Sequence, residues 1–284
     1  MQRTTQWKSL AVIALLGCCL SAWAGAAGLS RDFQGPDGKT LPFHNDEEIL
    51  EFLKSGEIVS MKKVGIGVTG VDKVRLSKDG VDLNAVFRDV RIYKPQHFED
   101  DGSITVHFRD DYIFELAAYR LGRLLGLDNI PPVVKRRIGN REGTLQLWIE
   151  DAVMEGTRIK KNLRPPLNMT WRLRWNTLYI FDYLIGNGDR NLGNILYDPQ
   201  WKMWMIDHTR AFRLLFDPED MERIKLCPRP LYQALKRLDR ETLDEHLGDL
   251  LGGNELKAVE KRRLELIQYL DDLIDRKGAE MILH

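Results

Sequence analysis

Apolar positions along the chain follow two periods, strand-like in the first half and mainly helical in the second. The strand-like runs are residues 58–64, 73–76 and 83–94. In the last run the apolar positions change parity after Phe87, to Val90 and Ile92. One extra residue in a strand reverses the faces that its side chains occupy, so we expect a β-bulge near Arg88 and Asp89.

Helical spacing of apolar residues occurs in four segments. These are residues 46–54, 111–127, 171–185 and about 218 to the end. Asn45 or Asp46 is the expected N-cap of the first segment, and Gly126 with two following prolines ends the second. The last segment predicts one buried stripe, formed by Leu264, Ile267, Leu270 and Ile274. Between the second and third segments, residues 133–138 and 144–149 predict a hairpin around Gly139 and Asn140.

This order of elements predicts an α+β fold with two lobes. A small antiparallel sheet with one helix fills residues 57–150, and a mainly helical lobe fills residues 151–284, with a junction near residues 150–152. Residues 25–56 form an N-terminal arm ahead of the first lobe. A chain of 284 residues is long enough for two lobes that share one site.

The N-terminus has the pattern of a targeting segment. Arg3 and Lys8 precede an apolar run at residues 10–20, and Ala22-Trp23-Ala24 fits a signal peptidase site. We therefore expect residues 1–24 to be a signal peptide and the protein to be exported, periplasmic or secreted in a bacterium. A lipoprotein signal with lipidation at Cys18 is the alternative, and only then do we expect membrane attachment.

Charge and cysteine content narrow the function classes. Lysine plus arginine equals aspartate plus glutamate at 42 each, so the chain lacks the basic excess of a dedicated nucleic-acid binder. Removal of residues 1–24 leaves Cys227 alone, which excludes an intramolecular disulfide and is interpreted as a small buried hydrophobe. The basic loop from Arg158 to Arg164 is interpreted as solvated, with an anionic acceptor or a lipid headgroup as the alternative.

The segment from Asp182 to Asn194, followed by 204–212, contains the chemistry. Asp189 and Asn194 have the spacing of the aspartate and asparagine of a kinase catalytic loop, and an apolar strand then leads to Asp207. In phosphoryl transfer one carboxylate orients the attacking hydroxyl, while an amide and a second carboxylate hold divalent metal against the phosphates. Asp189 is thus the candidate catalytic residue, and Asn194 and Asp207 are the candidate metal ligands.

These motifs resemble those of a family of atypical kinases. Asp-Arg-x-x-Gly-Asn with Ile-Asp-His-x-x-Ala-Phe resembles the phosphatidylinositol 3-/4-kinase-like group, and residues 114–127 with Ile130-Pro131-Pro132 resemble the αC region of the secretory-pathway Golgi casein kinases. The resemblance extends in patches over residues 60–215. It implies a two-lobed protein-kinase-like fold that uses ATP with Mg²⁺ or Mn²⁺.

The same resemblance suggests the nucleotide-binding residues. Gly65, Gly67 and Gly70 between two predicted strands are the candidate phosphate loop. The phosphate-binding lysine is expected at Lys94 in Ile-Tyr-Lys-Pro, with Arg88 in Ala-Val-Phe-Arg as the alternative at that position. Glu115 is the expected ion-pair partner, because a glutamate within an apolar helix face is unfavourable to bury alone.

The sequence therefore predicts an exported phosphotransferase that moves the γ-phosphate of ATP to a hydroxyl. The acceptor class stays open between protein, sugar and lipid. A non-catalytic pseudokinase that serves as a binding or scaffold module is the alternative, favoured by the export signal and by Arg88. Nucleotidyl transfer on the same fold is a third possibility.

Overall fold

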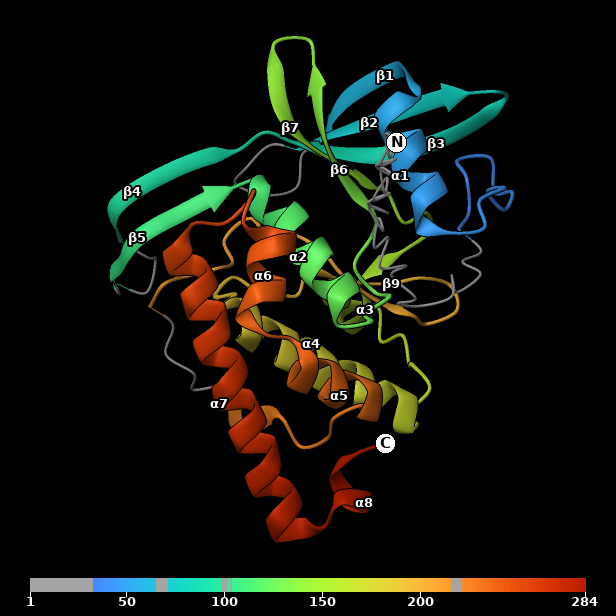
Figure 1. The fold of residues 1–284 in the computed structure, drawn as a ribbon. Helices are drawn as coiled ribbons and strands as arrows, with labels where there is room; N and C mark the ends of the chain where they lie inside the picture. Colours follow the sequence, from blue (N-terminus) through green and yellow to red (C-terminus); the bar gives the residue numbers. More distant parts are fainter. Residues whose placement is uncertain (1–32, 65–70, 99–101, 103, 216–220) are drawn as a thin grey trace, which may run out of the picture.

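The computed structural model describes residues 33–64, 71–98, 102, 104–215 and 221–284. A five-stranded antiparallel sheet forms the upper part of the molecule in Figure 1, with strand order β1-β2-β3-β7-β6. Its strands are β1 (Glu57–Val64), β2 (Val71–Lys78), β3 (Val81–Arg88), β6 (Val133–Ile138) and β7 (Arg141–Leu147). The last two form the hairpin expected around Gly139 and Asn140. The β2 positions alternate between buried and partly exposed, which is why this strand shows a clear period of two.

The helix α1 (Asp46–Ser55) lies against this sheet and begins at Asn45, whose side chain accepts a hydrogen bond from the Glu48 amide at 2.9 Å. Residues ahead of α1 also enter the core of the small lobe. Phe33 and Leu41 join the buried cluster of the sheet, and the Phe33 ring lies 5.4 Å from that of Trp204. The N-terminal arm therefore packs on both lobes.

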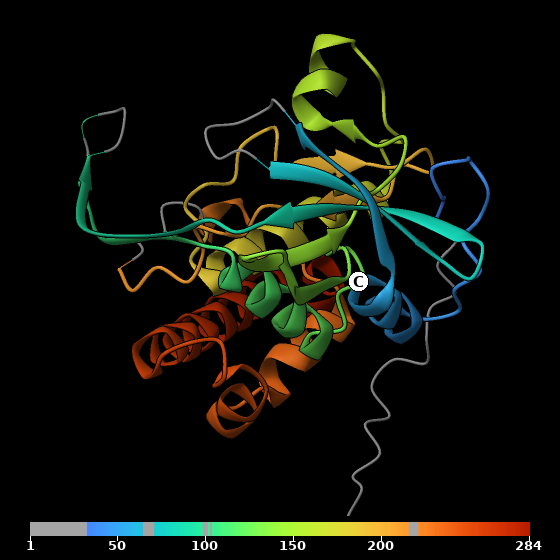
Figure 2. The ribbon, with the colours of Figure 1, turned by 90° about the horizontal axis from the view of Figure 1, so that it is seen from above.

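The expected bulge near Arg88 and Asp89 is absent from the described structure, and that prediction is wrong. The chain leaves the five-stranded sheet after β3 and begins a separate two-stranded sheet of β4 (Arg91–Phe98) and β5 (Ile104–Asp111). The parity change marks this exit from one sheet to another. Figure 2 shows the β4–β5 hairpin extending away from the rest of the molecule, which explains why β5 lacks the apolar pattern of a core strand.

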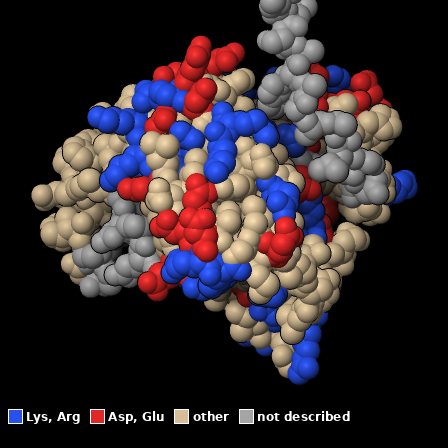
Figure 3. All heavy atoms as spheres, turned by 60° about the horizontal axis from the view of Figure 1, so that its bottom comes forward, with Lys and Arg blue, Asp and Glu red and all other residues tan. Residues whose placement is uncertain are grey.

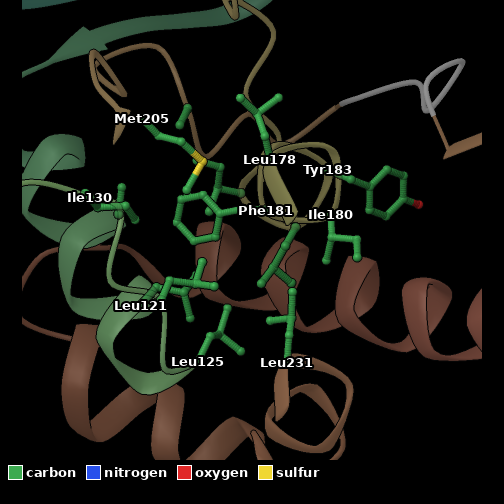
Figure 4. Packing of buried hydrophobic residues seen from close by; sticks show 14 of the residues in the cluster. Leu121, Leu125, Ile130, Leu178, Ile180, Phe181, Tyr183, Met205 and Leu231 are labelled. Atoms are coloured by element: carbon green, nitrogen blue, oxygen red, sulfur yellow. The ribbon is translucent and has the colours of Figure 1, made fainter. Parts of the chain in front are cut away.

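The larger lobe is mainly helical. Its elements are α2 (Ile113–Leu124), β8 (Val153–Met154), α3 (Glu155–Lys160), α4 (Met169–Ile185), β9 (Ile195–Tyr197), β10 (Met203–Met205), a 3-10 turn (Met221–Arg223), α5 (Arg229–Arg237), α6 (Arg240–Leu247), α7 (Gly253–Lys277) and α8 (Ala279–Ile282). Helix α4 is buried along most of its length, and Figure 4 shows Phe181 packed among side chains of α2, α4 and α5. Helix α2 comes before the junction near residues 150–152 in the sequence. Most of its apolar residues nevertheless belong to the buried hydrophobic cluster of the helical lobe.

Helix α7 shows one error in the predicted stripe. Leu270 is buried, whereas Leu264 is 53% exposed. The buried stripe consists of Leu256, Val259, Leu266, Leu270 and Leu273. Arg262 and Arg263 share the buried face, because their guanidinium groups donate to backbone carbonyls. Because two arginines lie on the buried face, the sequence pattern did not show which side of α7 is buried.

Within the part of the chain that the structure describes, none of the helices combines the length and the apolar character needed to cross a membrane. The predicted signal peptide and Cys18 lie outside the described residues. Cys227 is buried, and burial raises the pKa of its thiol to about 12, as expected for a residue that serves packing.

We predict that Phe181→Ala destabilises the protein by about 3–5 kcal/mol, because removal of a fully buried ring leaves a cavity at the centre of the helical lobe. Urea unfolding monitored by circular dichroism measures this. The exposed residue of α7 provides the control, since Leu264→Ala changes stability by less than about 0.5 kcal/mol. Equal effects of the two substitutions would contradict the described core.

Candidate active site

The candidate catalytic loop begins where α4 ends. Gly186 adopts a left-handed conformation with φ of 60°, and the amide of Asn187 donates to the Asp182 carbonyl at 2.9 Å. The Asn187 side chain donates to the Asp182 carboxylate at 2.9 Å and accepts from the Asp189 amide at 3.2 Å. These bonds fix how the chain turns from the helix toward Asp189.

The side chain of Arg190 forms hydrogen bonds that link the candidate catalytic loop to its neighbouring segments. Its guanidinium donates twice to the Asp182 carboxylate, with both contacts at 2.8 Å. It also donates to the Asn194 carbonyl at 2.8 Å and to the Ile206 carbonyl at 2.7 Å. One side chain thus joins the end of α4, the loop and the end of β10. Asp182 is therefore a structural carboxylate.

Pairing of β9 with β10 brings Asn194 and Asp207 close to each other. Ile195 pairs with Met205, and the next backbone bond runs from the Ile206 amide to the Asn194 carbonyl at 3.2 Å. Asp207 follows with φ of 60°, a left-handed conformation that few non-glycine residues adopt and that aspartate tolerates better than most. The Asp207 side chain is 29% exposed, so it is accessible to a ligand.

Asp189 lies in a cluster of opposite charges. Burial raises the pKa of its carboxyl; Asp207 and Asp110 act in the same direction, and Arg210 and Arg213 oppose them. An Arg210 nitrogen lies 3.6 Å from an Asp189 oxygen, while the Nε of Arg210 donates to Asp110 at 2.9 Å. A carboxylate with a raised pKa is a better proton acceptor than an ordinary surface aspartate.

Glu115 on α2 is fully buried, and the structure gives it different partners from the lysine expected. The His208 amide and the His208 ring donate to its two oxygens at 2.8 and 3.0 Å, and Gln146 donates at 2.8 Å. Burial alone would raise the pKa of Glu115. The contacts with His208 and the charge of Arg88 outweigh burial and lower the pKa to about 2.

The structure corrects the lysine assignment, because the partners that it gives to Glu115 and Asp207 do not include Lys94. Lys94 is exposed on β4, and its ammonium group lies 3.2 Å from the His97 ring. Arg88 at the end of β3 is instead buried, with a guanidinium nitrogen 3.8 Å from the Asp207 carboxylate. A Cβ added at Gly143 would lie 2.1 Å from the Arg88 carbonyl oxygen, so only glycine allows β7 to approach this point.

The glycines of the candidate phosphate loop, Gly65, Gly67 and Gly70, lie outside the described residues. The strands that flank them are described, and Val64 pairs with Val71 at the loop end of the β1–β2 hairpin. Their role stays a prediction.

Two side chains have the chemistry to hold a divalent cation. The Asn194 amide nitrogen donates to the Asp189 carbonyl at 3.0 Å, which directs the amide oxygen away from that bond. With the Asp207 carboxylate it supplies hard oxygen ligands suited to Mg²⁺ or Mn²⁺. Among the described residues no group of three or more His, Cys, Asp or Glu side chains is arranged to hold a metal. The pair would supply two ligands to a divalent cation and would leave its other positions to phosphate oxygens and water.

The comparisons with solved structures bear on the fold. The structure of hydra Fam20 with sugar aligns with a TM-score of 0.66 and 18% identity, over 86% of this chain and 94% of that chain. The Golgi casein kinase aligns with a TM-score of 0.59 and 17% identity, over 84% and 78%, both alone and with Mn/ADP bound. The fold is kinase-like. No family model and no curated protein matches the chain.

The similarity confirms the α+β, two-lobed kinase-like architecture expected from the sequence. The phosphatidylinositol 3-/4-kinase-like grouping stays a prediction. Among the site residues that had no role in the sequence interpretation are Asp110, Gln146 and Arg210. Arg210 follows Asp207 closely enough to have been suspected, whereas Asp110 and Gln146 reach the site only through the pairing of strands.

We predict that Asp182→Ala lowers the free energy of unfolding by about 3–5 kcal/mol, since it leaves the Arg190 guanidinium buried without its carboxylate. The matched control is Asp244→Ala, which breaks the exposed i,i+4 pair with Arg240 and changes stability by less than about 1 kcal/mol. Chemical denaturation measures both variants. A similar small effect at both positions would show that Arg190 does not depend on Asp182.

We also predict an acid-sensitive stability term from Glu115. Its folded pKa is depressed from 4.5 to about 2, so its stabilisation is complete above about pH 4.5 and is lost as the pH falls toward 2. The full term is about 3 kcal/mol. Urea unfolding of the wild type and Glu115→Gln across this range measures it, with the exposed Glu241→Gln as the control. An unchanged pH slope in Glu115→Gln would contradict the assignment.

Proposed function

We propose that the protein is an ATP-dependent phosphotransferase that uses Mg²⁺ or Mn²⁺ and acts on a hydroxyl group. The observation that supports this most strongly is the assembly of Asp189, Asn194 and Asp207 by one loop and one pair of short strands. The Asp189 carboxylate is suited to orient the acceptor hydroxyl, and the Asn194 amide and the Asp207 carboxylate are suited to hold the metal. The kinase-like fold of the chain agrees with this chemistry.

The roles of the residues follow from their surroundings. Asp189 accepts the proton of the acceptor hydroxyl, helped by its raised pKa. Asn194 and Asp207 would hold the divalent cation, which neutralises charge on the phosphates when it is bound. Arg88 replaces Lys94 as the candidate phosphate-binding cation, and Glu115 fixes His208 and the backbone beside Asp207.

We further propose that the protein is exported, on the basis of the pattern in residues 1–24. A kinase of the Golgi is among the structures with this fold. The acceptor is a hydroxyl of a protein, a sugar or a lipid, and nucleic acid is disfavoured by the balanced charge.

A non-catalytic pseudokinase is the competing proposal. Arg88 favours it, because a planar guanidinium presents its charge differently from a lysine ammonium group. The three oxygen-bearing residues of the site oppose it, since a scaffold has no need of a metal-binding pair beside a carboxylate of raised pKa.

The first measurement is the thermal midpoint of the chain from Gly25 with ATP, with Mn²⁺, and with both. Two protein ligands leave most of the coordination sphere to phosphates, so we expect a shift with both together and little shift with Mn²⁺ alone. Ligand at about 100 times its dissociation constant contributes roughly 2.7 kcal/mol, and each kcal/mol moves the midpoint by about 2–4 °C. Asp207→Ala should abolish the metal-dependent part.

Turnover separates the two proposals. We expect Asp189→Asn to bind ATP and metal as the wild type does while its phosphoryl transfer falls at least about 100-fold. The control Asp244→Ala retains both properties, because that carboxylate lies in an exposed pair on α6. A wild type that binds nucleotide without turnover over a broad acceptor panel would favour the pseudokinase. Full activity in a folded Asp207→Ala variant would overturn the metal assignment.

A further inference from the structure

One stretch of this neutral chain is uniformly basic. Residues 156–181 contain no aspartate or glutamate and six cationic side chains, which are Arg158, Lys160, Lys161, Arg164, Arg172 and Arg174. Elsewhere the charges are mixed, and Figure 3 shows Lys and Arg interspersed with Asp and Glu over the face in view. Of the described residues, no carboxylate forms an ion pair with Lys160, Lys161 or Arg164.

Exposed aliphatic side chains lie among these cations. Ile159 is 51% exposed, Leu163 36%, Leu167 84% and Met169 40%. We call this surface the α3 patch, and it consists of Ile159, Lys160, Lys161, Leu163, Arg164, Leu167 and Met169. Figure 2 shows α3 and the loop after it standing out from the rest of the ribbon.

Backbone and side-chain hydrogen bonds within the segment fix the conformation of the patch. The Leu163 amide donates to the Arg158 carbonyl at 3.0 Å, and the Arg158 guanidinium donates to the Leu163 carbonyl at 2.9 Å. Asn168 caps α4 by accepting from the Trp171 amide at 2.9 Å. A loop fixed at both ends keeps its aliphatic side chains outside, and it loses little conformational entropy when they are buried by a ligand.

We propose that the α3 patch docks on an anionic lipid bilayer. Aliphatic side chains that enter the acyl boundary, flanked by Lys and Arg that meet anionic headgroups, are the composition of a membrane-surface contact. A folded protein partner fits less well, because protein interfaces favour Tyr, Trp and Arg and are depleted of Lys. The proposal does not depend on phosphoryl transfer.

The position of the patch gives docking a consequence for the site. The Gly156 amide at the start of α3 donates to the carbonyl of Leu192, within the candidate catalytic loop, at 3.0 Å. Contact of α3 with a bilayer therefore places the loop that contains Asp189 near the membrane surface. If the proposed transferase activity holds, its acceptor is a lipid headgroup or a membrane-bound protein.

Vesicle binding tests the proposal. The chain from Gly25 retains every residue of both hydrophobic clusters, so it is sedimented with vesicles of phosphatidylcholine alone or with one quarter phosphatidylglycerol. We expect preferential binding to the anionic vesicles. Lys160→Ser with Lys161→Ser lowers this affinity about 30-fold, and Ile159→Ser with Leu167→Ser lowers it at least about tenfold.

Control substitutions outside the α3 patch show whether the loss of vesicle binding is specific to the patch. The adjacent exposed pair Lys62→Ser with Lys63→Ser removes the same charge on β1, and Leu264→Ser with Met281→Ser removes exposed aliphatic side chains from α7 and α8. Both controls bind as the wild type does. Equal binding of patch and control variants, or equal binding of the wild type to neutral vesicles, overturns the proposal. A wild-type dimer that only the patch variants dissociate would also overturn it, in favour of a second copy as the occupant.

Discussion

The buried pair of Arg190 and Asp182 is the interaction on which the candidate site depends. An arginine keeps its charge at any relevant pH, so burial of this side chain requires acceptors on every side. The acceptors come from the end of α4, from Asn194 and from Ile206, which are separate segments of the chain. Because one rigid guanidinium satisfies all three, the positions of Asp189 and Asp207 relative to each other are set by hydrogen-bond geometry.

Around this anchor two pairs of opposite charges lie in near contact and are not joined by direct hydrogen bonds. Arg88 lies 3.8 Å from Asp207, and Arg210 lies 3.6 Å from Asp189. At these separations each arginine neutralises a carboxylate without occupying it fully. An anionic ligand can take up such an arginine and leave the carboxylate free to bind a cation or a proton.

The sequence was sufficient to predict the fold class, and it located the candidate catalytic loop, whose role stays a prediction. Both depend on local patterns. The spacing of Asp189 and Asn194 and the apolar strand before Asp207 are readable without tertiary structure. Arg88 was one of two candidates for the phosphate-binding position, and strand pairing decides which of the two cations lies beside Asp207. The β4–β5 hairpin was missed for a related reason: both of its faces are largely solvent-exposed, so neither strand needs alternating apolar residues.

Helix α2 connects the two lobes in a way that affects folding. It precedes the junction near residue 150, yet Phe114, Ala117 and Leu121 belong to the hydrophobic cluster of the helical lobe, while the same helix contacts β6 and β7 of the sheet. A fragment that ends at the junction would keep the sheet and expose this apolar face. The two lobes therefore share this helix and are not independent folding domains.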